Sequence, residues 1–377
     1  MAKSLELITI PSLIDPHVHF REPGGEAKET IASGSLAALH GGYQMEADMS
    51  NNPVFPTWTE ERIVEKQVIA RPTSYTDVAF YQGNDLRDPN LSEIRRMAPY
   101  AIGSKNYLGH TTGNLYEFVL DDARPAIDEY IDVTNELNLH GPNVLHAREE
   151  VGYETAEYIA RQGRHVHWAH LSTASEAEYA AKLTKKYGQY FTAGVTPHHL
   201  TMTDRNADFQ QGWNGARMQP PLAQEVDADA LLYAYNKGDI QILETDHAPH
   251  TIDDKMKAET DNPEGEMDPE CTTCFGVSGI EFVLPVMTAL VRRKKITMER
   301  LVDSTYDQPM RMLGLRACQM TSKTTLLMGP YVIGEDDIVG KSRNTPYVGW
   351  TAGAKVVASD MMMRKPKVLG AQPRRAA

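Results

Sequence analysis

The sequence predicts an α/β protein built on a closed (β/α)8 barrel of the TIM type, with a small C-terminal module that favours β-structure. Short apolar segments alternate with helical patterns through most of the 377 residues, which is typical of βαβ units and a parallel sheet. Eight such units follow one another along the chain, and eight favour a closed barrel over an open sheet.

The expected strands are short apolar segments, each followed by polar residues. They cover residues 12–20, 43–49, 77–81, 101–108, 143–146, 165–170, 190–196 and 239–245. Because strands of a barrel are parallel, we expect their carboxyl ends to meet at one face, where the reactive groups of barrel enzymes lie.

The expected helices between these strands lie at residues 28–40, 125–137, 153–162 and 176–187, and a long helix at 280–293 follows the last strand. Gly41 and Gly42 are a good stop signal for the first of them. Thr57 and Glu60 have capping-box spacing for a further helix, and Thr173 with Glu176 has the same spacing before 176–187.

The two ends of the chain are expected to form a separate unit. We predict a barrel over residues 11–320 and a small accessory β-module made of 1–10 and 321–377, which ends in a basic C-terminal tail.

Composition excludes several classes of protein. The chain has 38 Lys and Arg against 51 Asp and Glu, a net charge of −13, which disfavours a nucleic-acid partner. Its most apolar stretch, 282–291, is too short to span a bilayer, so we expect no membrane partner. Three cysteines, an odd and low number, fit a reducing cytoplasm. Cys271 and Cys274 have the spacing of half a zinc site, but no second pair completes it.

Polar side chains at the carboxyl ends of the expected strands point to a metal site. His17 and His19 are two residues apart on the first strand, so both imidazoles face one side. Imidazole and carboxylate groups are zinc ligands. Residues of these two types at the ends of other expected strands are His146, His170 and Asp246, and Lys105 lies in the fourth expected strand. A single strand-end histidine is more often a hydrogen-bonded structural group, but several on different strands converge only around a common axis.

Other histidines compete for the same role. His165 and His167 have the opposite strand parity to His170, so we expect them to face outward. His198 and His199 follow a proline, and their part in the site stays open at this point.

Two long segments resemble the signatures of dihydroorotases, members of the amidohydrolase superfamily. They are DPHVHFREPG at 15–24 and TDHAPH at 245–250. Shorter segments around Lys105, His146 and His170 resemble the remaining motifs of that family, in the correct order between the two signatures.

The resemblance implies a cofactor of two Zn²⁺ ions per chain. Carried over by position, His17, His19 and Asp246 would bind one ion, and His146 and His170 the other. A carboxylated Lys105 and a hydroxide would bridge the two. The carbamate is chemically reasonable, since it is an anionic ligand whereas an ammonium group would repel both ions.

The resemblance also implies the reaction and its substrate contacts. Arg21, Asn51 and His250 would bind the substrate, and Thr111 would contact it from a loop that closes over the ligand. Asp246 would act as the catalytic base and then the acid. The reaction would be the reversible hydrolysis of (S)-dihydroorotate to N-carbamoyl-L-aspartate in de novo pyrimidine biosynthesis.

The alternatives are another cyclic amidohydrolase, of the allantoinase or hydantoinase type, and a non-catalytic scaffold for aspartate carbamoyltransferase. Arg21 favours an acidic substrate over a neutral ring. Ser50, Gln219 and Glu244 depart from the usual family pattern, as does the loop 272–276. We expect a homo-oligomer, in the form of a dimer, and leave association with aspartate carbamoyltransferase open.

Overall fold

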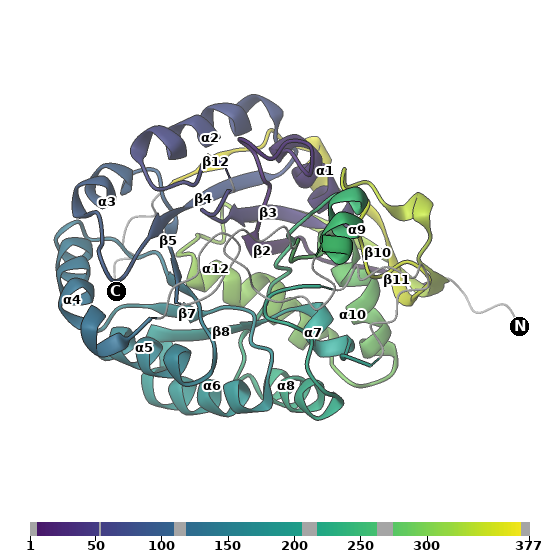
Figure 1. The fold of residues 1–377 in the computed structure, drawn as a ribbon. Helices are drawn as coiled ribbons and strands as arrows, with labels where there is room; N and C mark the ends of the chain where they lie inside the picture. The colour runs from purple at the N-terminus through teal and green to yellow at the C-terminus, as the bar shows by residue number, and fades with distance from the viewer. Residues whose placement is uncertain (1–5, 53, 109–117, 206–216, 262–273, 371–377) are drawn as a thin grey trace, which may run out of the picture.

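The computed structural model describes residues 6–52, 54–108, 118–205, 217–261 and 274–370. Its largest sheet contains eight parallel strands whose spatial order follows the chain. They are β2 (Leu13–Val18), β3 (Tyr43–Asp48), β4 (Asp77–Asn84), β5 (Gly103–Tyr107), β6 (Asn143–His146), β7 (Val166–Trp168), β8 (Phe191–Val195) and β9 (Ile242–Leu243). A bridge between Val18 and His247, four residues after the end of β9, links the two ends of this row of strands. The predicted (β/α)8 class is confirmed, and Figure 1 shows helices surrounding the strands.

The described helices are α1 (Ile31–Gly41), α2 (Glu60–Thr73), α3 (Leu91–Met97), α4 (Leu120–Glu136), α5 (Glu149–Arg161), α6 (Ala174–Tyr187), α7 (Pro197–Thr201), α8 (Glu225–Lys237), α9 (Ile252–Asp261), α10 (Val283–Arg292), α11 (Met298–Val302) and α12 (Gln308–Met312). The five helices that the sequence predicts by range are present as α1, α4, α5, α6 and α10, and each begins within five residues of its predicted start. Within the described ranges, no helix is both long and apolar enough to cross a membrane.

The capping residues at the start of α6 are those that the sequence predicts, whereas those at α2 differ. Thr173 and Glu176 form the predicted capping box at the start of α6. At α2 the predicted cap is wrong, because Thr59 and not Thr57 accepts the hydrogen bond from the backbone of Arg62. Thr57 is unavailable because its backbone bonds both Ser50 and Gly83, which fixes it in the loop before the helix.

Both chain ends add strands beside the barrel. Strand β1 (Glu6–Pro11) pairs antiparallel with β10 (Lys323–Val332), which pairs with β11 (Thr351–Ser359). Strand β12 (Val368–Leu369) pairs with the first part of β4. The division into a barrel of 11–320 and an accessory module stays a prediction.

The part of the barrel interior away from the carboxyl ends of the strands is apolar. Ile14, Met45 and Tyr81 belong to one buried apolar cluster with Met312, at the end of α12, a helix that is visible through the ring of strands in Figure 1. Since this end is filled by apolar side chains, polar groups gather at the carboxyl ends of the strands.

Candidate metal centre

A pocket opens at the carboxyl ends of the barrel strands. It brings together all six predicted metal ligands with two of the predicted substrate contacts. Its lining consists of His17, His19, Arg21, Asn51, Lys105, Tyr107, His146, His170, Gln219, Asp246, Ala248, Phe275 and Gly276.

One group of donor atoms comes from the first and last strands of the barrel. Oδ1 of Asp246 lies 3.3 Å from Nε2 of His17 and 3.1 Å from Nε2 of His19. One ligand atom from each residue lies within 4.8 Å of the other two. Two imidazoles and a carboxylate at this spacing are a suitable donor set for zinc.

A second group lies beside it. Nδ1 of His146 is 2.9 Å from Nε2 of His170. Nζ of Lys105 is 3.3 Å from Nε2 of His17, so the lysine reaches the first group from β5, the strand next to the one that carries His146. The six side chains therefore form one continuous cluster.

Burial sets the protonation of these groups. It lowers the pKa of His17 to about 4, with Lys105 adding to the effect, and it lowers the pKa of His170 well below its usual value. Neutral imidazoles keep the lone pair that a metal needs. Burial also lowers the pKa of Lys105 to about 8, against the opposing effect of Asp246.

Three residues of the pocket have left-handed backbone conformations that are uncommon for residues other than glycine. The φ angles are 60° at Arg21, 41° at His170 and 45° at Asp246. Each such residue costs on the order of 1–3 kcal/mol and persists only where its surroundings enforce it. The strain concentrates where side chains must converge on the pocket.

Arg21 enters the pocket from the loop after β2 and lies beside His250, with the carboxylates of Asp246 and Asp48 among its charged neighbours. Its Nε donates to the carbonyl of Pro249 at 3.1 Å, and its Nη2 lies 3.2 Å from Nε2 of His250. Nζ of Lys28 lies 3.0 Å from Nδ1 of His250. His250 itself is not part of the pocket lining, and its Nε2 also lies 2.8 Å from the carbonyl of Phe275. Burial lowers the pKa of His250 well below its usual value, so the guanidinium of Arg21 is the positive group of this pair that suits an anionic ligand.

The loop that carries Asn51 is held by a buried ion pair. Nζ of Lys66 lies 2.6 Å from Oδ2 of Asp48 and donates to the Met49 carbonyl at 3.0 Å and to Oδ1 of Asn52 at 3.2 Å. The sequence alone offered no sign of this pair. The ion pair between Lys66 and Asp48 places Asn51 at the edge of the pocket.

The predicted outward orientation of His167 is wrong. Its Nε2 lies 3.1 Å from Oε2 of Glu244 inside the barrel, and only His165 stays half-buried beside Thr192. The parity argument failed because β7 ends at Trp168, so His170 lies beyond the strand and its direction does not follow the alternation.

The remaining expectations fall outside the pocket. His198 and His199 do not line it. His199 bonds Thr196 and the Pro220 carbonyl, with Nε2 3.1 Å from the latter. Thr111 and Cys271 lie outside the described residues. Glu244, which sequence reasoning noted only as a departure from a pattern, proves to contact two histidines of the barrel interior.

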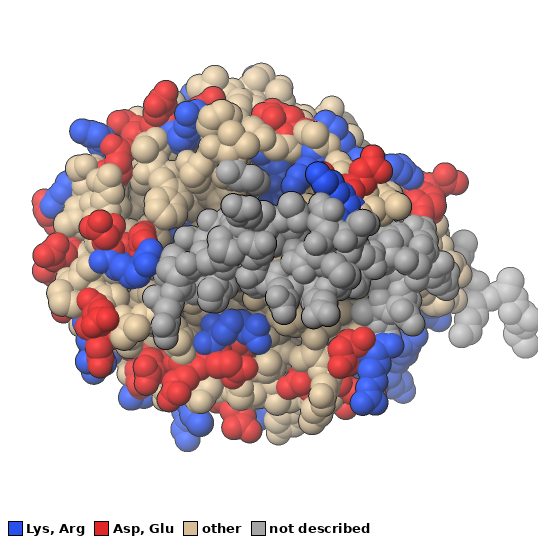
Figure 2. Space-filling view, viewed as in Figure 1, with Lys and Arg blue, Asp and Glu red and all other residues tan. Residues whose placement is uncertain are grey.

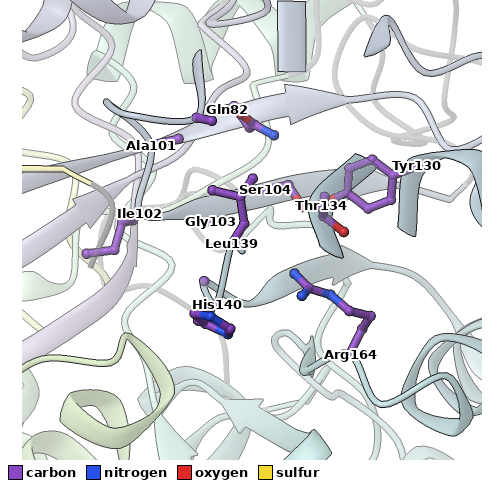
Figure 3. Close-up of a pocket in the computed structure, with 12 residues that line it drawn as sticks. Gln82, Ala101, Ile102, Gly103, Ser104, Tyr130, Thr134, Leu139, His140 and Arg164 are labelled. Carbon is purple, nitrogen blue, oxygen red and sulfur yellow. Dashed lines mark hydrogen bonds between the residues drawn. The ribbon is translucent and has the colours of Figure 1, made fainter. Parts of the chain in front are cut away.

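Another cavity lies near the amino-terminal ends of β5 and β6. Ser104, Tyr130 and Arg164 are among the residues that line it (Figure 3). Ser104 and Tyr130 also bond Asn143. The cavity shares no lining residue with the metal-centre pocket, and its polar groups largely satisfy one another.

Over the carboxyl face, acidic and basic side chains are interspersed among the coloured residues of Figure 2. On that view, the described residues do not form a continuous basic surface such as a nucleic-acid partner requires.

Comparisons with known proteins agree with this geometry. A family model described as dihydro-orotase-like matches residues 6–90. The dihydroorotase of Bacillus caldolyticus is 31% identical over 372 residues, which cover 91% of this chain and 83% of that protein.

Solved structures share the fold. The dihydropyrimidinase of Brevibacillus agri has a TM-score of 0.80 at 16% identity, with 98% of this chain and 90% of that chain covered. The inactive dihydroorotase-like domain of a CAD-like multifunctional protein from Chaetomium thermophilum has a TM-score of 0.71 at 16% identity, with 93% and 92% covered. At these identities the structural similarity supports the barrel fold alone.

Proposed function

Since the chain belongs to the dihydroorotase family, we infer that it is a hydrolase of a cyclic amide that interconverts dihydroorotate and N-carbamoyl-aspartate in pyrimidine biosynthesis. The observation that carries this inference is the position of Arg21, whose guanidinium enters the same pocket as the six ligand side chains. A planar, permanently charged fork beside a hydrolytic centre suits a ring that bears a carboxylate.

We propose that two zinc ions bind the cluster. The donor set fits them: His17, His19 and Asp246 would hold one ion, and the adjacent nitrogens of His146 and His170 would hold the other. When bound, the ions would supply an acidified water as nucleophile and would polarise the carbonyl of the ring amide.

Lys105 would serve as a bridging ligand in its carboxylated form. An amine must be neutral to add carbon dioxide, and the reaction releases one proton and leaves a carbamate anion. Burial favours the neutral amine, and the position of Nζ beside His17 places the resulting carboxylate among the other ligands.

The remaining steps belong to the side chains around the substrate. The Asp246 carboxylate takes the proton of the attacking water and gives it to the ring nitrogen that leaves, so it acts as base and then as acid. Arg21 pairs with the substrate carboxylate, while Asn51 hydrogen-bonds it from the next strand. For His250, a contact with the bound substrate stays a prediction. For Thr111, a contact with the bound ring stays a prediction.

The competing function is hydrolysis of a neutral ring, as the names of the hydantoinase and dihydropyrimidinase structures suggest. Arg21 argues against it, because this residue is only 6% exposed, lines the pocket and carries a planar, permanently charged fork that suits a carboxylate better than a neutral ring. The scaffold alternative, which the inactive domain represents, is disfavoured because this chain keeps every ligand type of the cluster.

The decisive experiment is to load the protein with zinc and bicarbonate and measure turnover of dihydroorotate, N-carbamoyl-aspartate and allantoin side by side. We expect interconversion of the first two and loss of it on chelation. Activity on allantoin alone would show that Arg21 does not bind a carboxylate. Two bound zinc ions without any turnover would favour another cyclic amide or a scaffold.

Three further properties are proposed on chemical grounds. A homodimer and association with aspartate carbamoyltransferase fit an enzyme of the pyrimidine pathway. A cytoplasmic location fits the odd and low number of three cysteines. Size-exclusion chromatography with light scattering, with and without the transferase, tests the first two.

A further inference from the structure

A buried carboxylate inside the barrel contacts both halves of the ligand cluster. Oε2 of Glu244 lies 3.2 Å from Nδ1 of His17. Its other oxygen, Oε1, accepts a hydrogen bond of 2.6 Å from the backbone N–H of His170. The side chain of Glu244 is fully buried, so water does not compete for these bonds.

At His17, Glu244 decides which nitrogen is free to bind a metal. Nε2 of His17 faces Asp246 and Lys105, at 3.3 Å from each, whereas Nδ1 faces Glu244. A carboxylate accepts hydrogen bonds but cannot donate them. It therefore fixes the proton on Nδ1 and leaves the lone pair of Nε2 directed at the cluster.

At His170, the same carboxylate holds a strained backbone. The φ angle of 41° is one that a residue with a side chain adopts only when its surroundings enforce it. The short bond from the His170 N–H to Glu244 is one such constraint, beside the backbone bonds that Ala169 and Leu171 make to Leu145 and Gly194. It gives a partner to the N–H of His170, which lies two residues beyond the end of β7.

The surrounding barrel is shaped to admit this side chain. A Cβ atom at Gly194 on β8 would lie 2.2 Å from Oε1 of Glu244, so a larger residue there would displace the carboxylate. His167 is bound between Glu244, 3.1 Å from its Nε2, and Thr192, 2.9 Å from its Nδ1. The threonine hydroxyl can donate to Nδ1, so Nε2–H is free to donate to the carboxylate.

We propose that Glu244 is a positioning residue that orients one ligand of each zinc ion, His17 through its ring and His170 through its backbone. The proposal rests on the metal centre of the proposed function. It assigns Glu244, Gly194 and His167 a shared role in metal affinity, without contact with the substrate.

The test compares Glu244→Gln with Glu46→Gln. Glu46 is equally buried on β3 and bonds Thr76, and within the described part of the chain it makes no hydrogen bond to a residue of the cluster. Zinc affinity is measured by competition with a chelator, and the visible spectrum of the cobalt(II)-loaded protein reports ligand geometry. We expect Glu244→Gln to bind metal about 10- to 100-fold more weakly with an altered cobalt spectrum, while Glu46→Gln matches the wild type.

Gly194→Ala is the second variant, for the case in which Glu244→Gln does not fold. It keeps the carboxylate but forces it to move, so the same loss of affinity is expected. Unchanged metal affinity and an unchanged cobalt spectrum in the folded variants would overturn the proposal.

Turnover separates this proposal from the proposed function. Wild-type protein that binds two zinc ions but does not act on dihydroorotate would refute the activity alone. Wild-type protein that binds no zinc would refute both. Full activity with normal affinity in Glu244→Gln would refute the positioning role alone.

Discussion

The side-chain nitrogen of Lys105 lies 3.3 Å from Nε2 of His17, inside a cluster of four histidines and Asp246. A protonated lysine there would repel two zinc ions, whereas its carbamate would bind them. If the proposed metal centre forms, the contact between these two residues is therefore the place where carbon dioxide would add to the lysine.

Carbon dioxide should be needed to rebuild the centre after metal removal. We expect chelated protein to regain turnover with zinc plus bicarbonate and to regain little with zinc in buffer free of carbon dioxide. Lys105→Ala should lose turnover under both conditions and bind fewer zinc ions per chain, as measured by elemental analysis. Full recovery without bicarbonate would show that Lys105 acts uncarboxylated.

Asp246→Asn should abolish turnover while leaving the fold largely intact. The amide keeps the shape of the side chain and an oxygen for the metal but cannot take a proton, and general acid–base catalysis is worth about 10²–10⁴ in rate. Circular dichroism and zinc content check the fold and the centre, and a coupled or direct assay checks turnover. Retained activity in this variant would contradict the assignment of Asp246 as base.

Replacing Arg21 should weaken substrate binding. A hydrogen bond to a charged group contributes about 1.5–3 kcal/mol, so we expect Arg21→Gln to lower kcat/KM for dihydroorotate by about 10- to 100-fold, mainly through KM. The matched control is Arg62→Gln on α2, where the ion pair with Glu65 is 30% and 39% exposed. A variant whose KM equals that of the wild type would remove Arg21 from the carboxylate contact.

Lys255 should make stability depend on pH. Burial lowers the pKa of Lys255 from 10.5 to about 7 in the folded chain. Between pH 7 and about 10.5 the unfolded chain binds the extra proton, so the free energy of unfolding rises with pH; below pH 7 the cost of protonating the buried amine is fully present. Urea unfolding at pH 6 and pH 9 should therefore show a smaller difference for Lys255→Met than for the wild type. Equal differences in the two proteins would show that the Lys255 amine stays protonated when buried.

The sequence by itself predicted the fold class and the gathering of four histidines and Asp246 at one face, whereas Lys105 was assigned to the cluster only through the resemblance to dihydroorotases. Alternation of apolar segments with helical patterns is a local property, and parallel strands necessarily bring their carboxyl ends to one face. The residues that follow those ends, such as His146 and Asp246, could therefore be placed together without knowledge of any distance.

Only the tertiary structure decided which groups support the cluster. The direction of His167, the contact of Glu244 with His17 and the pairing of β12 with β4 each join segments far apart in the chain. These contacts depend on where each strand ends and on how the strands are staggered around the barrel. Strand parity predicts neither, because a strand that ends two residues early, as β7 does before His170, releases the following side chains from the alternation. Packing around a closed barrel, rather than local preference, sets the positions of these residues.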